Sequence, residues 1–140
     1  MQKIVDLKGS EKSMAEWEYA AAMNRLREEE EKLARIRAER REIEERLTQA
    51  AAGRVTLSEL TSLQAYLEVV DARIERQAAD VSAAEARVRE RQGKLAEKAV
   101  EEKVWLKARE KAYEAFQYIS LAKQQNELDE LASIRAANRG

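Results

Sequence analysis

Apolar residues recur every seven positions along the second half of the chain. One heptad position holds only apolar side chains, namely Leu60, Leu67, Ile74, Val81, Val88 and Leu95. The position three residues further on holds Leu63, Val70, Gln77, Ala84 and Arg91. Seven-residue spacing returns each side chain to nearly the same face of a helix, so this seam requires another helix to cover it.

A second heptad pattern runs upstream and supplies the expected partner. One of its positions holds Tyr19, Leu26, Leu33 and Leu47, and the other holds Ala22, Ile36, Ile43 and Ala50. Only Glu29 and Arg40 interrupt this stripe. Both halves of the chain therefore present seams of the kind found in coiled coils.

A short turn between the two patterns predicts that they form an antiparallel hairpin. Gly53 is suited to end the first helix because glycine accepts the left-handed conformation. Thr56-Leu57-Ser58-Glu59 then has the pattern of a capping box, in which the Glu59 side chain reaches back to the backbone N–H of Thr56. Short connections between helices force neighbouring helices to run antiparallel.

The predicted fold is all-α: a long two-helix antiparallel coiled-coil hairpin whose second helix is longer and overhangs. It forms a single elongated domain over residues 1–140. The first helix covers about 5–51, the turn 52–56, the second helix about 57–133 and the tail 134–140. The first helix can start near Val5 or at a capping box over Ser13-Met14-Ala15-Glu16.

The hairpin also predicts which residues face each other. Facing residues should have numbers that add to about 107 if the turn is short. Leu47 then meets Leu60, and Leu33 meets Ile74. Of the two interruptions of the first seam, Arg40 falls near Leu67 and Glu29 falls near Gln77.

The same register leaves the end of the second helix without a partner. The first helix is used up at about Trp105, which leaves an overhang of about 40 Å. The overhang is rich in aromatic side chains, since four of the seven in the protein are Trp105, Tyr113, Phe116 and Tyr118. Trp105, Ala112, Phe116 and Ile119 prolong the seam, and a second stripe of Tyr118, Leu121, Gln125, Leu128 and Leu131 follows. Exposed apolar surface of this extent is typical of a docking site. The alternative is that the amino-terminal segment folds further along and covers Trp105 and Ala112.

Composition argues against an enzyme and against a cofactor. The sequence has no histidine, cysteine or proline, and its charged residues (38%) include both signs, with a net charge of −1. Without histidine and cysteine, the usual general base, the usual zinc ligands and thiol nucleophiles are missing. We expect no catalytic residues, no metal site and no cofactor, because the many carboxylates suit a solvated helix face.

Membrane insertion and nucleic-acid binding are also disfavoured. No apolar run is long enough to span a bilayer, so a cytoplasmic protein is expected. The candidates for a nucleic-acid-binding arm are Arg35, Arg37, Arg40 and Arg41, but they sit among glutamates rather than in a basic stripe.

Several stretches resemble the FliJ family of flagellar export proteins. They are Val55-Thr56-Leu57-Ser58-Glu59-Leu60, Leu63-Gln64-Ala65-Tyr66-Leu67, Glu97 to Val104, Leu106 to Lys111 and Gln125 to Leu131. Met1 to Lys12 is similar to the start of that family. Leu63 and Tyr66 depart from it, because the family often has tyrosine and phenylalanine at these positions.

The resemblance implies a non-enzymatic adaptor of the flagellar type III export apparatus. Its implied partners are the hexameric export ATPase, which it binds as a central stalk, the export gate membrane protein and export chaperones. The protein is expected to be a monomer that reaches the cytoplasmic membrane at the flagellar base only through partners. The ring-binding residues expected on the overhang are Trp105, Tyr113, Phe116, Ile119 and Leu128, and those expected to contact the gate are Gln64 and Tyr66. The competing interpretation is a structural coiled-coil rod that homodimerises through the uncovered seam.

Overall fold

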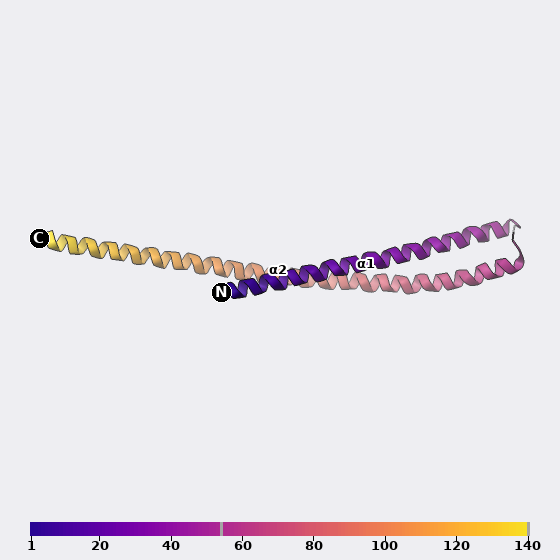
Figure 1. Ribbon diagram of the computed structural model, residues 1–140, viewed down its shortest axis with the longest axis horizontal. Helices are drawn as coiled ribbons and strands as arrows, with labels where there is room; N and C mark the ends of the chain where they lie inside the picture. Colours follow the sequence, from indigo (N-terminus) through magenta and orange to yellow (C-terminus); the bar gives the residue numbers. More distant parts are fainter. Residues whose placement is uncertain (54, 140) are drawn as a thin grey trace. The chain divides into compact units, whose positions relative to one another are not determined.

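A computed structural model describes residues 1–53 and 55–139, and the secondary structure of this part of the chain is helical. Helix α1 spans Gln2–Ala51 (50 residues), and helix α2 spans Leu57–Arg139 (83 residues) (Figure 1). The predicted all-α fold with a longer second helix is confirmed. In the part of the chain that the structure describes, no helix is both long enough and apolar enough to cross a bilayer.

Both helices extend beyond their predicted ends. Helix α1 begins at Gln2 rather than near residue 5, and α2 continues through residues 134–139, which were expected to form a tail. Neither extension contains a proline that would break a helix. Arg54 of the predicted turn and Gly140 of the predicted tail lie outside the described residues.

Contacts divide the chain into two compact units. The hairpin unit is Met14–Ala96, and the end unit consists of Met1–Ser13 together with Glu97–Gly140. A single domain over residues 1–140 stays a prediction of the sequence, which unfolding experiments can test.

In the hairpin unit, the helices reverse direction at the predicted turn (Figure 1). Gly53 has a φ of 80°, and its N–H donates to the carbonyl oxygen of Ala50 at 2.9 Å. This left-handed conformation ends α1 at little cost because glycine has no Cβ. At the start of α2, the backbone N–H of Glu59 donates to Oγ1 of Thr56 at 3.2 Å, as expected of the residue that caps a helix.

The apolar seams predicted from the heptads form the core of the hairpin unit. Its buried apolar side chains are Ala15, Ala22, Leu33 and Ile43 from α1, and Val70, Val81 and Ala84 from α2. The predicted contact of Glu29 with Gln77 is present, and both side chains are buried. Arg40 was expected near Leu67; its Nε donates to Oδ1 of Asp71 at 2.5 Å, one helical turn further along α2.

Charged pairs flank this core and show that the helices of the unit run antiparallel. Arg73 donates to Glu39 at 3.1 Å, and Arg91 donates to Glu18 at 3.2 Å. The partner on α1 thus moves back along the sequence as the partner on α2 moves forward. Such partly exposed pairs contribute little energy individually, so the apolar core carries most of the stability.

The end unit pairs the first thirteen residues with the part of α2 that begins at Glu97. Three lysines contribute to its ion pairs: Lys8 with Glu101 at 3.3 Å, Lys98 with Glu11 at 3.2 Å, and Lys12 with Glu102 at 3.3 Å. Among the described residues of this unit, Val5 is the buried apolar side chain.

Two glycines within the helices have different surroundings. A Cβ on Gly9 would lie 3.1 Å from a carboxylate oxygen of Glu102, so a side chain there would require this carboxylate to shift by a few tenths of an ångström. A Cβ on Gly93 would meet nothing within 4 Å. Gly93 does not interrupt α2, since one glycine in a helix interior costs only about 1 kcal/mol relative to alanine.

Candidate partner-binding surfaces

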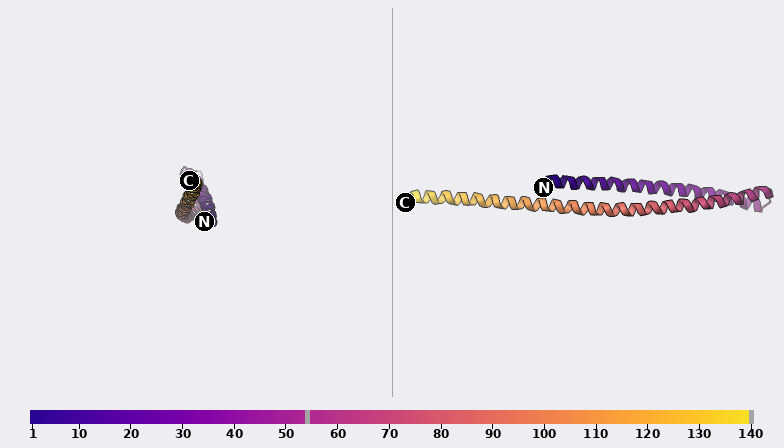
Figure 2. Two further views of the ribbon diagram at one scale, coloured as in Figure 1. Left: turned by 90° about the vertical axis from the view of Figure 1, so that its left-hand side faces the viewer. Right: turned by 90° about the horizontal axis from the view of Figure 1, so that it is seen from below.

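The end unit contains a long stretch of α2 that the amino-terminal segment does not reach. Near the start of α1, a guanidinium N–H of Arg109 donates to the side-chain oxygen of Gln2 at 3.0 Å. From residue 110 to residue 139, every side chain is exposed except that of Ser120, which is intermediate. Figure 2 shows this part of α2 continuing past the amino terminus of the same unit. We call residues 110–139 the uncovered segment.

Four of the five residues expected to bind the ATPase ring lie on the uncovered segment. Their exposed fractions are 61% for Tyr113, 69% for Phe116, 66% for Ile119 and 60% for Leu128. Side chains of this size are usually buried, so their exposure together is informative. The segment is therefore rich in exposed aromatic and aliphatic side chains.

Trp105 differs from the other four residues. It precedes Arg109 in the part of α2 that pairs with the amino-terminal segment, and its side chain is only partly exposed. Of the two expectations for Trp105, the structure thus favours cover by the amino-terminal segment, although Ala112, which was expected to share that cover, is exposed. The reason is that α1 begins earlier than predicted and extends alongside this part of α2.

Further exposed apolar residues accompany the five expected ring-binding residues. On the uncovered segment, Tyr118, Leu121 and Leu131 belong to the predicted second stripe, and Ile134 follows it. Before it, Val100 and Val104 are 62% and 58% exposed, and their spacing of four residues places them on one face of the helix. Sequence reasoning did not single out Val100, Val104 or Ile134, although the four-residue spacing of the two valines was a usable signal.

Tyr113 also borders a groove near the start of α1. This groove has a volume of about 590 Å³. It is lined by Gln2, Lys103, Leu106, Lys107, Arg109, Glu110 and Tyr113. Because α1 contributes only Gln2, the groove consists mainly of the surface of α2.

The residues expected to contact the export gate lie near the turn of the hairpin unit. Tyr66 is 43% exposed, and its hydroxyl donates to a carboxylate oxygen of Glu39. This bond raises the pKa of Tyr66 and lowers the pKa of Glu39. Glu39 also accepts a bond from Arg73, so the ring of Tyr66 is held against α1 by its polar end.

The structure does not bring Gln64 and Tyr66 to the same feature. Tyr66 lines a groove of about 560 Å³ together with Arg46, Gln49, Val55, Ser58, Glu59, Ser62 and Leu63. Gln64 is exposed but does not line this groove. Leu57, 78% exposed at the start of α2, is an apolar residue near the turn that the sequence did not single out.

Two observations concern the carboxylates of the described residues. Within residues 1–53 and 55–139, no group of three or more carboxylates is arranged to hold a metal ion. Glu29 is a buried carboxylate of the hairpin unit. Its pKa is lowered from the ordinary value, mainly by the hydrogen bond from Gln77 and further by the positive charges of Lys32 and Arg25. A lowered pKa suits a structural ion pair rather than a general acid.

In a comparison with known protein families, the model of a family described as "Flagellar FliJ protein" matches residues 1–140. No curated protein and no solved structure matches the chain.

Proposed function

The chain belongs to the flagellar FliJ protein family, and from this premise we propose that it is a non-enzymatic adaptor of the flagellar type III protein export apparatus. The family is a non-catalytic component of flagellar export, so a role associated with export follows from membership. In the proposal, the protein binds the hexameric export ATPase as a central stalk. It also links the ATPase to the export gate and to substrate chaperones.

The uncovered segment is the observation that carries this proposal. Five large apolar residues fall within nine positions of α2: Tyr113, Phe116, Tyr118, Ile119 and Leu121, each more than 60% exposed. At 3.6 residues per turn, these positions spread around the whole circumference of the helix. One partner helix covers one face only, whereas a ring whose subunits surround the helix can contact all of them.

Charge substitution within this segment tests the proposal. In Phe116→Glu with Ile119→Glu, two large apolar side chains become charged at exposed positions. Loss of their burial in the complex, worth about 1.5–3 kcal/mol for each side chain, should weaken binding to the ATPase ring by about a hundredfold or more. Stimulation of ATP hydrolysis should disappear, while helicity measured by circular dichroism stays unchanged.

A matched control separates loss of apolar contact from the added charge. Gln117→Glu with Gln124→Glu adds the same charge at exposed polar positions of the same segment. This variant should keep most of the stimulation. Equal stimulation by the Phe116/Ile119 variant and the unaltered protein would refute the ring-binding assignment.

In the same proposal, Leu128 extends the ring-binding surface, and Trp105 contributes only the exposed part of its side chain. Gln64 and Tyr66 form the contact with the export gate near the turn. For the gate, Gln64→Ala with Tyr66→Ala should weaken binding to the isolated gate protein. Tyr66→Phe keeps the aromatic side chain and removes only the hydroxyl group, so it serves as the control for Tyr66→Ala.

The adaptor is further proposed to be a cytoplasmic monomer that meets the membrane at the flagellar base through its partners. A second candidate, a structural coiled coil that homodimerises, rests on the same exposed Phe116 and Ile119. Sedimentation equilibrium over a wide concentration range distinguishes them. A monomer at every concentration supports the adaptor, and a dimer that Phe116→Glu with Ile119→Glu dissociates supports the second candidate.

A further inference from the structure

Glu29 and Gln77 form a buried polar layer within the seam of the hairpin unit. Glu29 of α1 is 4% exposed and Gln77 of α2 is 9% exposed. The side-chain amide of Gln77 donates to a carboxylate oxygen of Glu29 at 2.5 Å and to its backbone carbonyl oxygen at 2.9 Å. We call this pair the polar layer. It connects the two helices through directional bonds, which the apolar layers of the seam lack.

The charge of Glu29 is balanced from its own helix. The second carboxylate oxygen lies 3.0 Å from a guanidinium nitrogen of Arg25 and 3.7 Å from the ammonium nitrogen of Lys32. Among the described residues, no buried side-chain nitrogen or oxygen is left without a hydrogen-bond partner. The layer is therefore satisfied as long as Gln77 faces Glu29.

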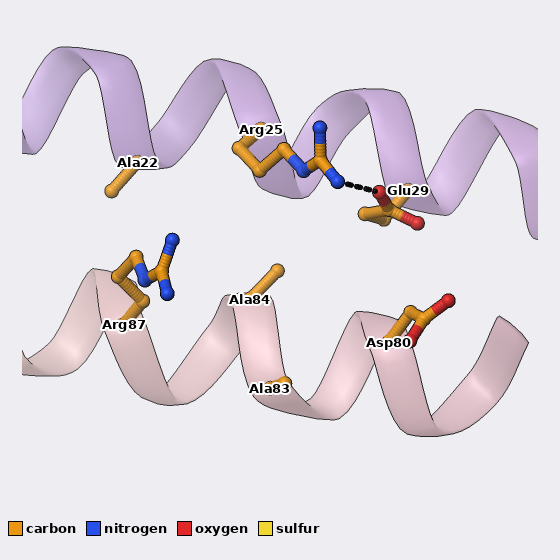
Figure 3. Close-up of a pocket in the computed structure, with 7 residues that line it drawn as sticks. All are labelled: Ala22, Arg25, Glu29, Asp80, Ala83, Ala84 and Arg87. Carbon is orange, nitrogen blue, oxygen red and sulfur yellow. Dashed lines mark ion pairs between the residues drawn. The ribbon is translucent and has the colours of Figure 1, made fainter. Parts of the chain in front are cut away.

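The neighbouring apolar layer selects its partner poorly by shape. Ala22 and Ala84 point into the space between α1 and α2 from opposite sides (Figure 3). Together with Arg25, Glu29, Asp80, Ala83 and Arg87, they line a solvent-open pocket of about 210 Å³ beside the seam. Each alanine contributes a single methyl group to the layer, so its side chains make few contacts that could favour one register over another.

A shift of one heptad between the helices distinguishes the polar layer from the rest of the seam. Seven residues to either side of Gln77 on α2 are Val70 and Ala84, and seven residues to either side of Glu29 on α1 are Ala22 and Ile36. In a shifted register, both polar side chains therefore face apolar ones. Each loses its partner across the seam, and a buried polar group without a partner is strongly unfavourable.

We propose that the Glu29–Gln77 layer fixes the register of α1 against α2 in the hairpin unit, while the apolar layers supply stability and little register information. A single buried polar pair has this effect in coiled coils, where it specifies register at a cost in stability. The competing explanation is that the turn alone fixes the register, because Gly53 already ends α1 at a defined position.

Pulsed electron–electron double resonance between two spin labels distinguishes these explanations. The sequence contains no cysteine, so Asn24→Cys and Glu68→Cys introduce the only labelling sites, both at exposed positions. A shift of one heptad changes their separation along the helix axis by about 10 Å. The labels are placed in the full chain with the original layer, with Glu29→Leu and Gln77→Leu, and with the exchanged pair Glu29→Gln and Gln77→Glu.

The original layer and the exchanged pair should each give one distance. The leucine layer should retain its helicity and melt at a higher temperature, yet show a second distance displaced by about 10 Å. A single, unshifted distance in the leucine variant would overturn the proposal and assign register to the turn. Loss of helicity in the leucine variant, or two distances in the exchanged pair, would also count against it.

Discussion

The adjacent residues Val69 and Val70 allow the contribution of the hairpin core to be measured with a matched control. Val70 is fully buried (0% exposed), whereas Val69 is 53% exposed on the same turn of α2. Both substitutions to alanine gain the same small amount from helix propensity, at most about 0.7 kcal/mol. Only Val70→Ala removes methyl groups from the interior.

The expected magnitude follows from the two carbon atoms removed. At about 0.8 kcal/mol per buried carbon group, their transfer to water accounts for about 1.6 kcal/mol, and the cavity left behind adds to it. The free energy of unfolding of Val70→Ala should therefore lie about 2 kcal/mol below that of Val69→Ala. Urea denaturation followed by circular dichroism at equilibrium measures the difference. If the two variants unfold at the same urea concentration, the assignment of Val70 to the core is wrong.

The remaining predictions concern two glycines, one carboxylate and the cooperativity of the chain. Gly53→Ala should lower the free energy of unfolding by about 1–2 kcal/mol because φ is positive at Gly53. Gly93→Ala should raise it by about 1 kcal/mol, because alanine favours a helix and a Cβ there meets no neighbour. Thermal melts in which Gly53→Ala is the more stable of the two variants would contradict the described backbone. The bond from Gln77 holds the pKa of Glu29 below its ordinary value of 4.5, so its stabilising contribution is complete above that pH and is lost as the pH falls through the lower folded-state pKa. Unfolding measured from about pH 6 to about pH 3 should therefore show a steeper loss for the unaltered protein than for Glu29→Gln, and parallel curves would count against it. The cooperativity of the chain can be measured with one tryptophan in each unit, Trp17 in the hairpin unit and Trp105 in the end unit, each observed after the other is replaced by Phe. If residues 1–140 form one cooperative domain, the fluorescence of both should report the same melting temperature. Two different melting temperatures would show that the units unfold independently.

The heptads predict the hairpin well because its core uses ordinary coiled-coil chemistry. Leu33, Ile43, Val70 and Val81 are buried as their positions in the repeat require. The contact of Glu29 with Gln77 could also be predicted, since two interruptions at matching positions of the seams must face each other. Periodicity thus determines which residues are buried, provided that the partner helix belongs to the same chain.

The amino-terminal pairing could not be predicted in the same way. Lys8, Glu11 and Lys12 find partners across the end unit, but lysine and glutamate occur along the whole chain and do not specify a register. For this reason, the sequence does not decide whether the amino-terminal segment covers Trp105, and it does not indicate that the first helix begins as early as Gln2. The exposure of Tyr113 and Phe116 was easier to expect, because the first helix has no residues left to reach them.

The balance of forces within the end unit makes it sensitive to ionic strength. Its amino-terminal segment is held by Val5 and by several half-exposed ion pairs. Dissolved salt screens such pairs but leaves apolar burial intact or strengthens it. Added salt should therefore weaken the pairing of Met1–Ser13 with α2 and increase the exposure of the Trp105 side chain. Ionic strength would then reversibly increase the area of α2 that is accessible to a partner.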